Sequence, residues 1–206
     1  MSRYTGPRVK RMRALGIDLP GLSRKSMWDR PYPPGVHGPK SARRRKMSDF
    51  KKQLLEKQKL RFNYGLNERQ LRSYFKKAAA GTSDTGQTLL QLLESRLDNV
   101  VFRAGFAPTI PAARQLVRHG HIRVNGKKVD VPSYAVRKGD TMTLREKSAK
   151  NAIYQEAFAA PTLEVPSYLQ RDEGKLQATF VERPSREDVP VEIQENLIVE
   201  HYSRVV

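Results

Sequence analysis

Residues 95–140 have the sequence "SRLDNVVFRAGFAPTIPAARQLVRHGHIRVNGKKVDVPSYAVRKGD", and the order of signals within this stretch decides the fold. Thr109 is suited to cap a helix, a proline follows in the first turn, and apolar residues recur at helical spacing until Gly120. Residues 121–129, "HIRVNGKKV", then alternate between apolar and polar side chains around Asn125-Gly126, a pair typical of tight hairpin turns. The stretch therefore predicts a helix that leads directly into a β-hairpin.

The flanking segments extend this pattern in both directions. A preceding helix of about four turns, ending at Gly105, is predicted by apolar residues at helical spacing: Leu89, Leu93, Leu97, Val100, Val101 and Ala104. A strand over residues 141–145 follows the hairpin, and a helix over 151–159 and a strand over 176–181 come next. From Leu89 onward the chain is therefore expected to combine helices with short strands.

The first 46 residues differ from the rest of the chain. They carry little helical or alternating pattern, and residues 30–39, "RPYPPGVHGP", contain four prolines and two glycines. Their apolar residues are too few for a core of their own. We therefore expect residues 1–46 to form an extended arm that becomes ordered only against a partner surface.

Two helices and a linker are predicted between the arm and the central stretch. The first helix begins at a cap at Ser48, and its apolar stripe is expected at Leu54, Leu55, Leu60 and Phe62. The second runs from a cap at Asn67 to residues 80–81. Residues 81–88, "GTSDTGQT", have Gln where a phosphate-binding loop needs Lys, and they are interpreted as a linker. Residues 191–203 predict a helix that returns to another surface of the chain.

The charge of the chain restricts its partners. It has 39 Lys and Arg against 21 Asp and Glu, a net charge of +18 and a pI near 10.3. Residues 1–61 hold 18 of the basic residues and 4 of the acidic ones, whereas residues 151–206 hold 5 and 10. Such a charge repels itself unless a polyanion neutralises it, so we expect a nucleic acid to contact the first two-thirds of the chain. The acidic last quarter is expected to face solvent, a basic patch of the chain or a protein partner.

Several other classes of protein are disfavoured. The chain has no cysteine, which excludes disulfides and thiolate chemistry. We expect no membrane-spanning helix, because no apolar run has the required length, and no secretory signal, because the N-terminus lacks the charged, apolar and small-residue series of one. No cofactor is expected.

Basic residues of the arm and of the two helices after it are candidate phosphate ligands, with one tyrosine and one histidine among them. They are Arg3, Arg8, Lys10, Arg11, Arg13, Arg30, Tyr32, His37, Arg43, Arg44, Arg45, Lys46, Lys51, Lys57, Lys59, Arg61, Arg69 and Arg72.

The central helix and hairpin carry a second cationic surface. Arg114 and Arg118 are four residues apart and so lie on one helix face, and the helix end and the turn add His119, His121, Arg123, Lys127 and Lys128. This surface suits folded RNA, which presents shape, phosphates and splayed bases. A metal site at His119 and His121 would need a third ligand. Asp98 is expected to be a structural partner or cap rather than a catalytic acid.

Four separate motifs resemble one family. Residues 95–140 resemble the αL-type RNA-binding module. The arm motif "RPYPPGVHG", the segment "EKQKLRFNYGLNERQ" (56–70) and the ending "ENLIVEHYS" (195–203) resemble small-subunit ribosomal protein four of the bacterial or organellar kind. The resemblance covers essentially the whole chain. It implies an α+β fold in which a helical domain (47–88 with 190–206) holds an inserted αL-type module (89–189), preceded by the basic arm (1–46). In the module, two helices would pack on a small, mainly antiparallel sheet.

The resemblance also implies a function without catalysis. Proteins of this family bind a multi-helix junction of small-subunit ribosomal RNA, nucleate subunit assembly and contribute to translational accuracy near the messenger entry, next to a neighbour called protein five. A cytoplasmic ribosome is expected, with an organellar one as the open alternative. Arg43, Arg44 and Arg45 would line the messenger entrance. The RNA-facing signature of the module would be Arg114, Gln115, Arg118, His119, His121, Arg123, Asn125 and Lys127.

Two departures from the family pattern stand out. Many relatives hold zinc in the arm with four cysteines, but this chain has none, so no zinc site of that kind is expected. Relatives usually have a basic residue near the start of the second module helix, where this chain has Ile110 and Pro111. The alternative reading is an RNA-modifying enzyme or another protein with the same module. A modifying enzyme would need a further catalytic domain, for which the chain has no room.

Overall fold

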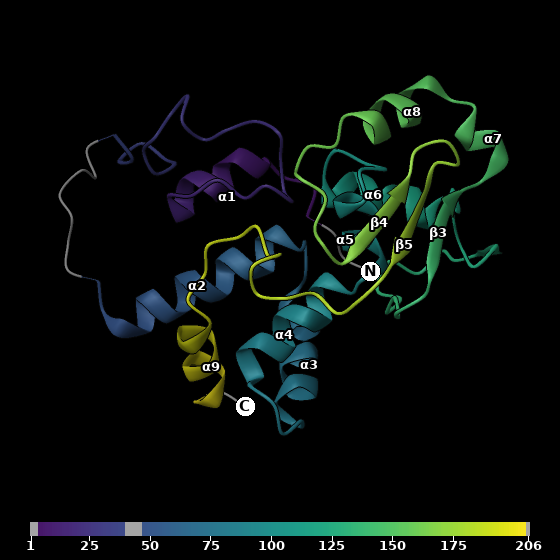
Figure 1. Cartoon of the computed structure of the whole chain (residues 1–206). Coiled ribbons are helices and arrows are strands. Elements are labelled where there is room, and N and C mark those ends of the chain that lie inside the picture. Colours follow the sequence, from purple (N-terminus) through teal and green to yellow (C-terminus); the bar gives the residue numbers. More distant parts are fainter. Residues whose placement is uncertain (1–3, 40–46, 205–206) are drawn as a thin grey trace. The chain divides into compact units, whose positions relative to one another are not determined.

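A computed structural model describes residues 4–39 and 47–204 of the chain. The chain forms two compact units, which we call the helical unit (Met1–Leu89 with Val191–Val206) and the sheet unit (Leu90–Pro190) (Figure 1). The finer division into an arm, a helical domain and a module stays a prediction. Of the helices in the described residues, none combines the length and apolar character that crossing a bilayer requires.

Helices dominate the helical unit. They are α1 (Arg8–Leu15), α2 (Asp49–Asn63), α3 (Glu68–Ala79), α9 (Glu195–Ser203) and the start of α4 (Thr85–Glu94). The predicted caps are confirmed: the Ser48 hydroxyl accepts from the Lys51 amide, and Asn67 forms a capping box with Gln70. The returning C-terminal helix is also confirmed, because α9 packs against α2 (Figure 1).

The face that α2 buries is more polar than predicted. Leu60 is buried as expected, but Leu54, Leu55 and Phe62 are only part-buried. The other buried positions of α2 are all polar or charged: Gln53, Glu56, Lys57 and Asn63. These side chains hydrogen-bond to other elements: Gln53 Nε2 donates to Glu200 Oε2 of α9 at 2.7 Å. The helix is therefore held by specific hydrogen bonds as well as by apolar packing, and a hydropathy pattern does not detect such bonds.

The arm is more ordered than predicted within residues 4–39. It contains α1, and its apolar side chains are buried inside the helical unit: Met12, Leu19, Leu22 and Met27. The Gly21 amide donates to Asn63 Oδ1 of α2 at 2.9 Å. The Arg11 guanidinium lies 4.1 Å from the centre of the Phe62 ring. The prediction that this segment becomes ordered only on a partner is therefore wrong for these residues, because α2 supplies the surface they need.

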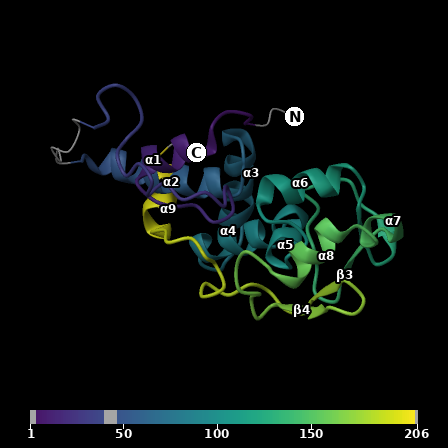
Figure 2. The same ribbon diagram turned by 90° about the horizontal axis from the view of Figure 1, so that it is seen from above.

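The sheet unit contains one antiparallel sheet and the helices that cover it. The strands are β1 (Ile122–Val124), β2 (Lys127–Lys128), β3 (Thr141–Leu144), β4 (Leu169–Asp172) and β5 (Gln177–Phe180), in the order β2-β1-β3-β5-β4. The helices are α5 (Leu97–Arg103), α6 (Ile110–Arg118), α7 (Glu146–Ala149) and α8 (Ala152–Ala159). Figures 1 and 2 show α5 and α6 side by side on one face of this sheet. The α+β class predicted from sequence is confirmed.

The helix predicted over residues 89–105 is in fact two helices. α4 ends at Glu94 and α5 begins at Leu97, because Arg96 has an extended backbone (φ −73°, ψ 138°) and forms a bridge with Ala135. α4 also begins at Thr85, inside the segment interpreted as a linker. The Asp84 carboxylate accepts from the Gln87 amide at 2.6 Å and so satisfies one free donor of the helix start. Strand β4 was not predicted.

Candidate nucleic-acid interface

The end of α6 and the hairpin are fixed by local backbone geometry. The Thr109 hydroxyl accepts from the Ala112 amide at the start of α6, as predicted. At the other end Gly120 has φ 68°, and the His121 amide donates to the Leu116 carbonyl at 3.1 Å, which turns the chain into β1. β1 then pairs with β3 in the centre of the sheet. The predicted helix-to-hairpin connection is confirmed.

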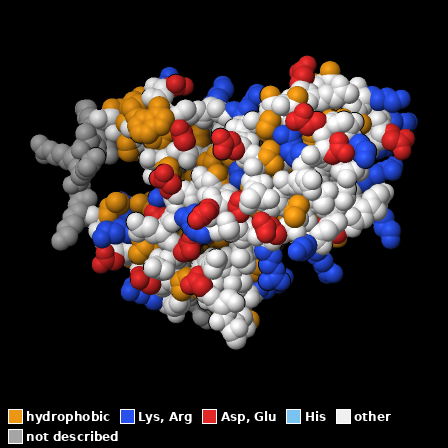
Figure 3. Space-filling view, viewed as in Figure 1, with side chains coloured by type: hydrophobic (Ala, Val, Ile, Leu, Met, Phe, Trp, Pro, Cys, Tyr) orange, Lys and Arg blue, Asp and Glu red, His pale blue; other side chains and the backbone are white. Residues whose placement is uncertain are grey.

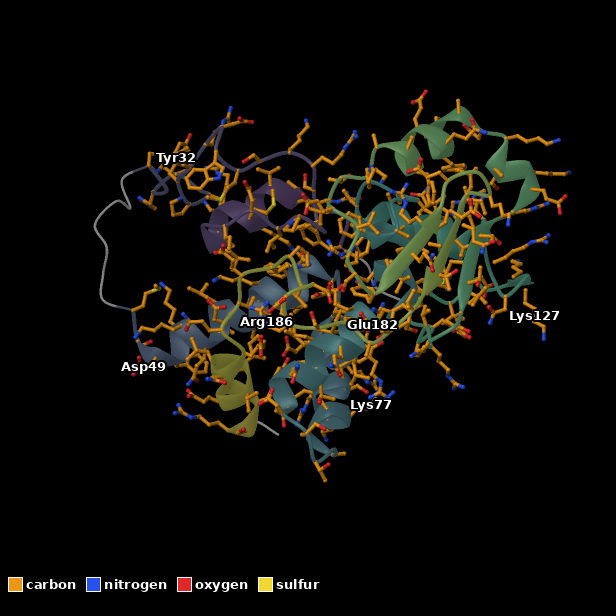
Figure 4. The ribbon with its side chains drawn as sticks, viewed as in Figure 1. Tyr32, Asp49, Lys77, Lys127, Glu182 and Arg186 are labelled. Atoms are coloured by element: carbon orange, nitrogen blue, oxygen red, sulfur yellow. The ribbon has the colours of Figure 1, made fainter. Side chains whose placement is uncertain are left out.

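The hairpin turn is held by the side chain of Asn125. Asn125 and Gly126 have φ values of 50° and 76°, as a two-residue turn of this kind requires. Asn125 Nδ2 donates to Asp140 Oδ1 at 2.8 Å, and Asn125 Oδ1 accepts from the Thr141 amide at 2.9 Å. The side chain of Asn125 is thus already bonded within the chain. Lys127 projects outward from this hairpin (Figure 4).

We call the predicted signature and Lys128 together the helix–hairpin surface: Arg114, Gln115, Arg118, His119, His121, Arg123, Asn125, Lys127 and Lys128. The structure brings them together on α6, β1, β2 and the turns that join these elements, with Arg114, His121 and Arg123 part-buried and the others exposed. The side chains of Arg118, Arg123 and Lys127 form no hydrogen bond or ion pair with another described residue. Their charges are therefore left for an external anion.

Arg114 differs from these three, because a buried carboxylate holds it. Its terminal nitrogen lies 2.7 Å from Asp98 Oδ2, and the same carboxylate binds the Arg96 guanidinium at 3.0 and 2.7 Å. The side chains of Asp98 and Arg96 are 1% and 2% exposed, whereas that of Arg114 is 23% exposed. Asp98 is thus a structural partner, as predicted. With two guanidinium groups on one carboxylate, the cluster keeps a net positive charge and fixes the direction of Arg114.

The two histidines lie close together, with ring centres 6.0 Å apart. His121 Nδ1 is 2.8 Å from the Ser148 hydroxyl. Burial, then the neighbouring His119 and Arg145, lower the pKa of His121, which favours its neutral form. In the part of the chain that the structure describes, no group of three or more His, Asp or Glu could hold a metal ion. The pair is suited to stacking and hydrogen bonding.

Acid should destabilise the chain in part through His121. Because its folded pKa is lowered, the unfolded chain binds this proton more readily, so stability falls as the pH drops below the ordinary histidine pKa of about 6.5. Urea unfolding at about pH 7 and about pH 5 measures the free energy of unfolding at each pH. The decrease on acidification should be smaller for His121→Gln than for the parent chain. An identical loss in both proteins would contradict the lowered pKa.

The candidate residues of the helical unit fall into three groups. Exposed side chains are Arg8, Lys10, Arg30, Tyr32, His37, Lys51, Arg69 and Arg72. Part-buried side chains are Arg11, Arg13, Lys59 and Arg61, and Lys57 is buried. Arg3, Arg43, Arg44, Arg45 and Lys46 lie outside the described residues.

Some of these cations already have partners inside the chain. Lys57 Nζ lies 3.0 Å from Glu68 Oε1, and Lys59 Nζ lies 2.6 Å from Glu56 Oε1. The Lys57 side chain is only 7% exposed, so it offers little surface to an external phosphate. RNA contacts by both lysines stay predictions.

Sequence reasoning overlooked a group of basic residues beside the helix–hairpin surface. Arg137 and Lys138 are exposed in the turn that contains Asp140, and the Asn125–Asp140 bond joins that turn to the hairpin. The exposed Arg145 follows β3, and its amide donates to the His121 carbonyl at 2.7 Å. Figure 3 shows Lys and Arg side chains along the edge that carries α7, β3 and the hairpin. The pair Arg137-Lys138 directly before the Gly139 turn could have indicated this extension.

A cationic helix–hairpin surface on a small α+β unit defines a nucleic-acid-binding protein. Residues 3–94 match the Ribosomal protein S4/S9 N-terminal domain, and residues 95–142 match the S4 domain. The chain is 58% identical to small ribosomal subunit protein uS4 of Methylobacillus flagellatus over 98% of both chains. It is 55% identical to uS4B of Nitrosomonas europaea over 98% of both, and 53% identical to uS4 of Synechococcus sp. CC9902 over the full length of both. The chain belongs to the small ribosomal subunit protein uS4 family, a family of structural proteins and not of enzymes.

Proposed function

We propose that this chain is a structural constituent of the small ribosomal subunit and binds its ribosomal RNA through the helix–hairpin surface. The observation that carries the proposal is the absence of internal counterions for Arg118, Arg123 and Lys127 among the described residues. Cations placed together without acids repel each other, and phosphates relieve that repulsion. Arg114, preoriented by Asp98, adds a fourth donor to the same surface.

The finer role follows the family resemblance. The chain binds a multi-helix junction, nucleates assembly of the subunit and contributes to accuracy near the messenger entry, where residues 43–45 would meet the messenger. Its neighbour is protein five, and its location is the cytoplasmic ribosome. The arm (1–46), the helical domain (47–88 with 190–206) and the module (89–189) are its functional divisions. What supports this role is the identity of 50% or more to each of several uS4 proteins along nearly the whole chain, together with the basic charge of residues 1–61.

Replacing Arg118 and Arg123 together by Ala should weaken binding to a small-subunit ribosomal RNA transcript about tenfold or more, because two phosphate ligands are lost. Filter binding at fixed salt measures the effect. Arg118 is exposed and Arg123 part-buried, and neither side chain is bonded to another described residue, so the circular dichroism spectrum should not change.

The matched control is Lys175→Ala with Arg183→Ala. These two cations are exposed in the same unit, outside the helix–hairpin surface, and their loss changes the net charge equally. The control should bind the RNA nearly as well as the parent chain. Equal weakening in both double variants would show that net charge alone drives binding, and would contradict the proposed surface.

A further inference from the structure

The arm exposes the only tryptophan of the chain. Trp28 is 66% exposed, although the residue before it, Met27, is 3% exposed. Among the described residues, no aromatic ring stacks on the Trp28 ring and no Lys or Arg side chain lies over its face. A tryptophan side chain offers a large apolar surface, and leaving most of it in water forgoes a substantial contribution to folding.

Hydrogen bonds hold this exposed ring on an ordered turn. The Asp18 carboxylate accepts from the Ser26 hydroxyl at 2.6 Å and from the Met27 amide at 2.8 Å. The Trp28 amide donates to the Ser26 hydroxyl oxygen at 3.2 Å, and the Arg30 amide donates to the Met27 carbonyl at 3.0 Å. With Met27 anchored in the core, the backbone on both sides of the ring is fixed. The ring is therefore presented outward by the fold.

Basic residues lie close to Trp28 in the chain, at Lys25 and Arg30. The residues on either side of Trp28 line a cavity of about 480 Å³ in the arm. Its charged lining residues are Lys10, Arg13, Lys25, Arg30 and Asp29, so basic residues outnumber acidic ones by four to one. The rest of the lining is largely apolar, from Pro7, Val9, Met27 and Pro34.

These cations differ in their availability. Arg13 donates to the Tyr32 and Pro33 carbonyls and lies over the Tyr32 ring, which Figure 4 labels on this part of the arm. The side chains of Lys10, Lys25 and Arg30 form no hydrogen bond or ion pair with a described residue. In Figure 3 hydrophobic side chains gather on the same part of the arm. The arm thus combines an exposed aromatic face with unneutralised cations.

We propose that residues 7–35 bind one unpaired ribonucleotide, with its base stacked on Trp28 and the adjoining phosphates held by Lys25 and Arg30. An aromatic platform flanked by cations binds single-stranded nucleic acid without strong sequence preference, because every base has a stacking face and every nucleotide a phosphate. The unpaired cations next to Trp28 in the arm favour this ligand over an apolar protein surface, which would bury them without neutralising them. The inference rests on the proposed function and adds a second RNA contact, on the helical unit.

Tryptophan fluorescence tests the inference directly, because Trp28 is the only tryptophan. Titration of the full chain with a small-subunit ribosomal RNA transcript should quench its emission. Trp28→Ala should weaken binding of that RNA by about 5- to 100-fold, the usual effect of losing one stacked base, and Trp28→Phe should retain most of the affinity. The matched control is Val36→Ala, which removes another exposed apolar side chain of the arm and should leave affinity unchanged.

The outcomes separate this inference from the proposed function. Tight RNA binding with unchanged Trp28 emission, and with Trp28→Ala within twofold of the parent chain, would overturn the stacking site and leave the ribosomal role intact. Trp28 would then be available to a protein neighbour instead. Failure of the parent chain to bind the RNA at all would overturn the proposed function itself.

Discussion

Replacing Asp98 by Ala should lower the free energy of unfolding by about 3–5 kcal/mol, the usual cost of removing one partner from a buried ion pair. Asp98 is completely buried and accepts hydrogen bonds from Arg96, from Arg114 and from the Asn99 amide. Its removal leaves the Arg96 guanidinium charged and 2% exposed, without its carboxylate. That desolvation cost, more than the loss of the attraction itself, produces the large effect.

Urea unfolding followed by circular dichroism measures this effect. Asp98→Asn keeps the shape but removes the charge, so it should destabilise the chain as well, though less than Ala, because an amide oxygen can still accept one hydrogen bond. The control is Asp130→Ala, an exposed acid of the same unit. If Asp98→Ala changed the free energy of unfolding by an amount within about 1 kcal/mol of that control, the stabilising role of the buried Asp98 cluster would be contradicted.

Affinity for the folded ribosomal RNA should fall about a thousandfold or more between roughly 50 and 200 mM salt, provided that six or more phosphates are contacted. The number of available cations supports this expectation. The helix–hairpin surface offers Arg118, Arg123 and Lys127, and the arm offers Lys10, Lys25 and Arg30, all without a described partner. Each phosphate contact releases condensed counterions, and so each makes binding more sensitive to salt.

Filter binding across a salt series gives the slope of log affinity against log salt. The Arg118→Ala, Arg123→Ala double variant should reduce the magnitude of that slope by about two, one unit for each lost phosphate contact. A shallow slope for the parent chain, equivalent to only one or two phosphates, would mean that most of these cations do not contact RNA.

Local signals explain which parts of the fold could be predicted. The caps at Ser48, Asn67 and Thr109 and the Asn125-Gly126 turn act through neighbouring backbone groups, and all four form as the sequence indicates. Likewise, the exposure of Arg118 and Lys127 follows from their positions on a helix end and a hairpin whose other faces are apolar.

Partners distant in the sequence explain what could not be predicted. The break before α5 depends on the bridge between Arg96 and Ala135, and the polar buried face of α2 depends on acceptors such as Glu200. For the same reason, Lys57 and Arg114 could not be distinguished from unpaired cations, because Glu68 and Asp98 meet them only in the folded chain. Hydropathy and charge patterns count cations but do not show which of them are neutralised.

Competition between folded small-subunit ribosomal RNA and duplex DNA, at moderate salt, tests the central claim most directly. If the exposed cations are arranged for the shape and unpaired bases of ribosomal RNA, the full chain should stay on that RNA while a large excess of duplex DNA is added. Equal displacement by equal amounts of phosphate from either nucleic acid would show that the chain binds by charge alone, and would contradict the account.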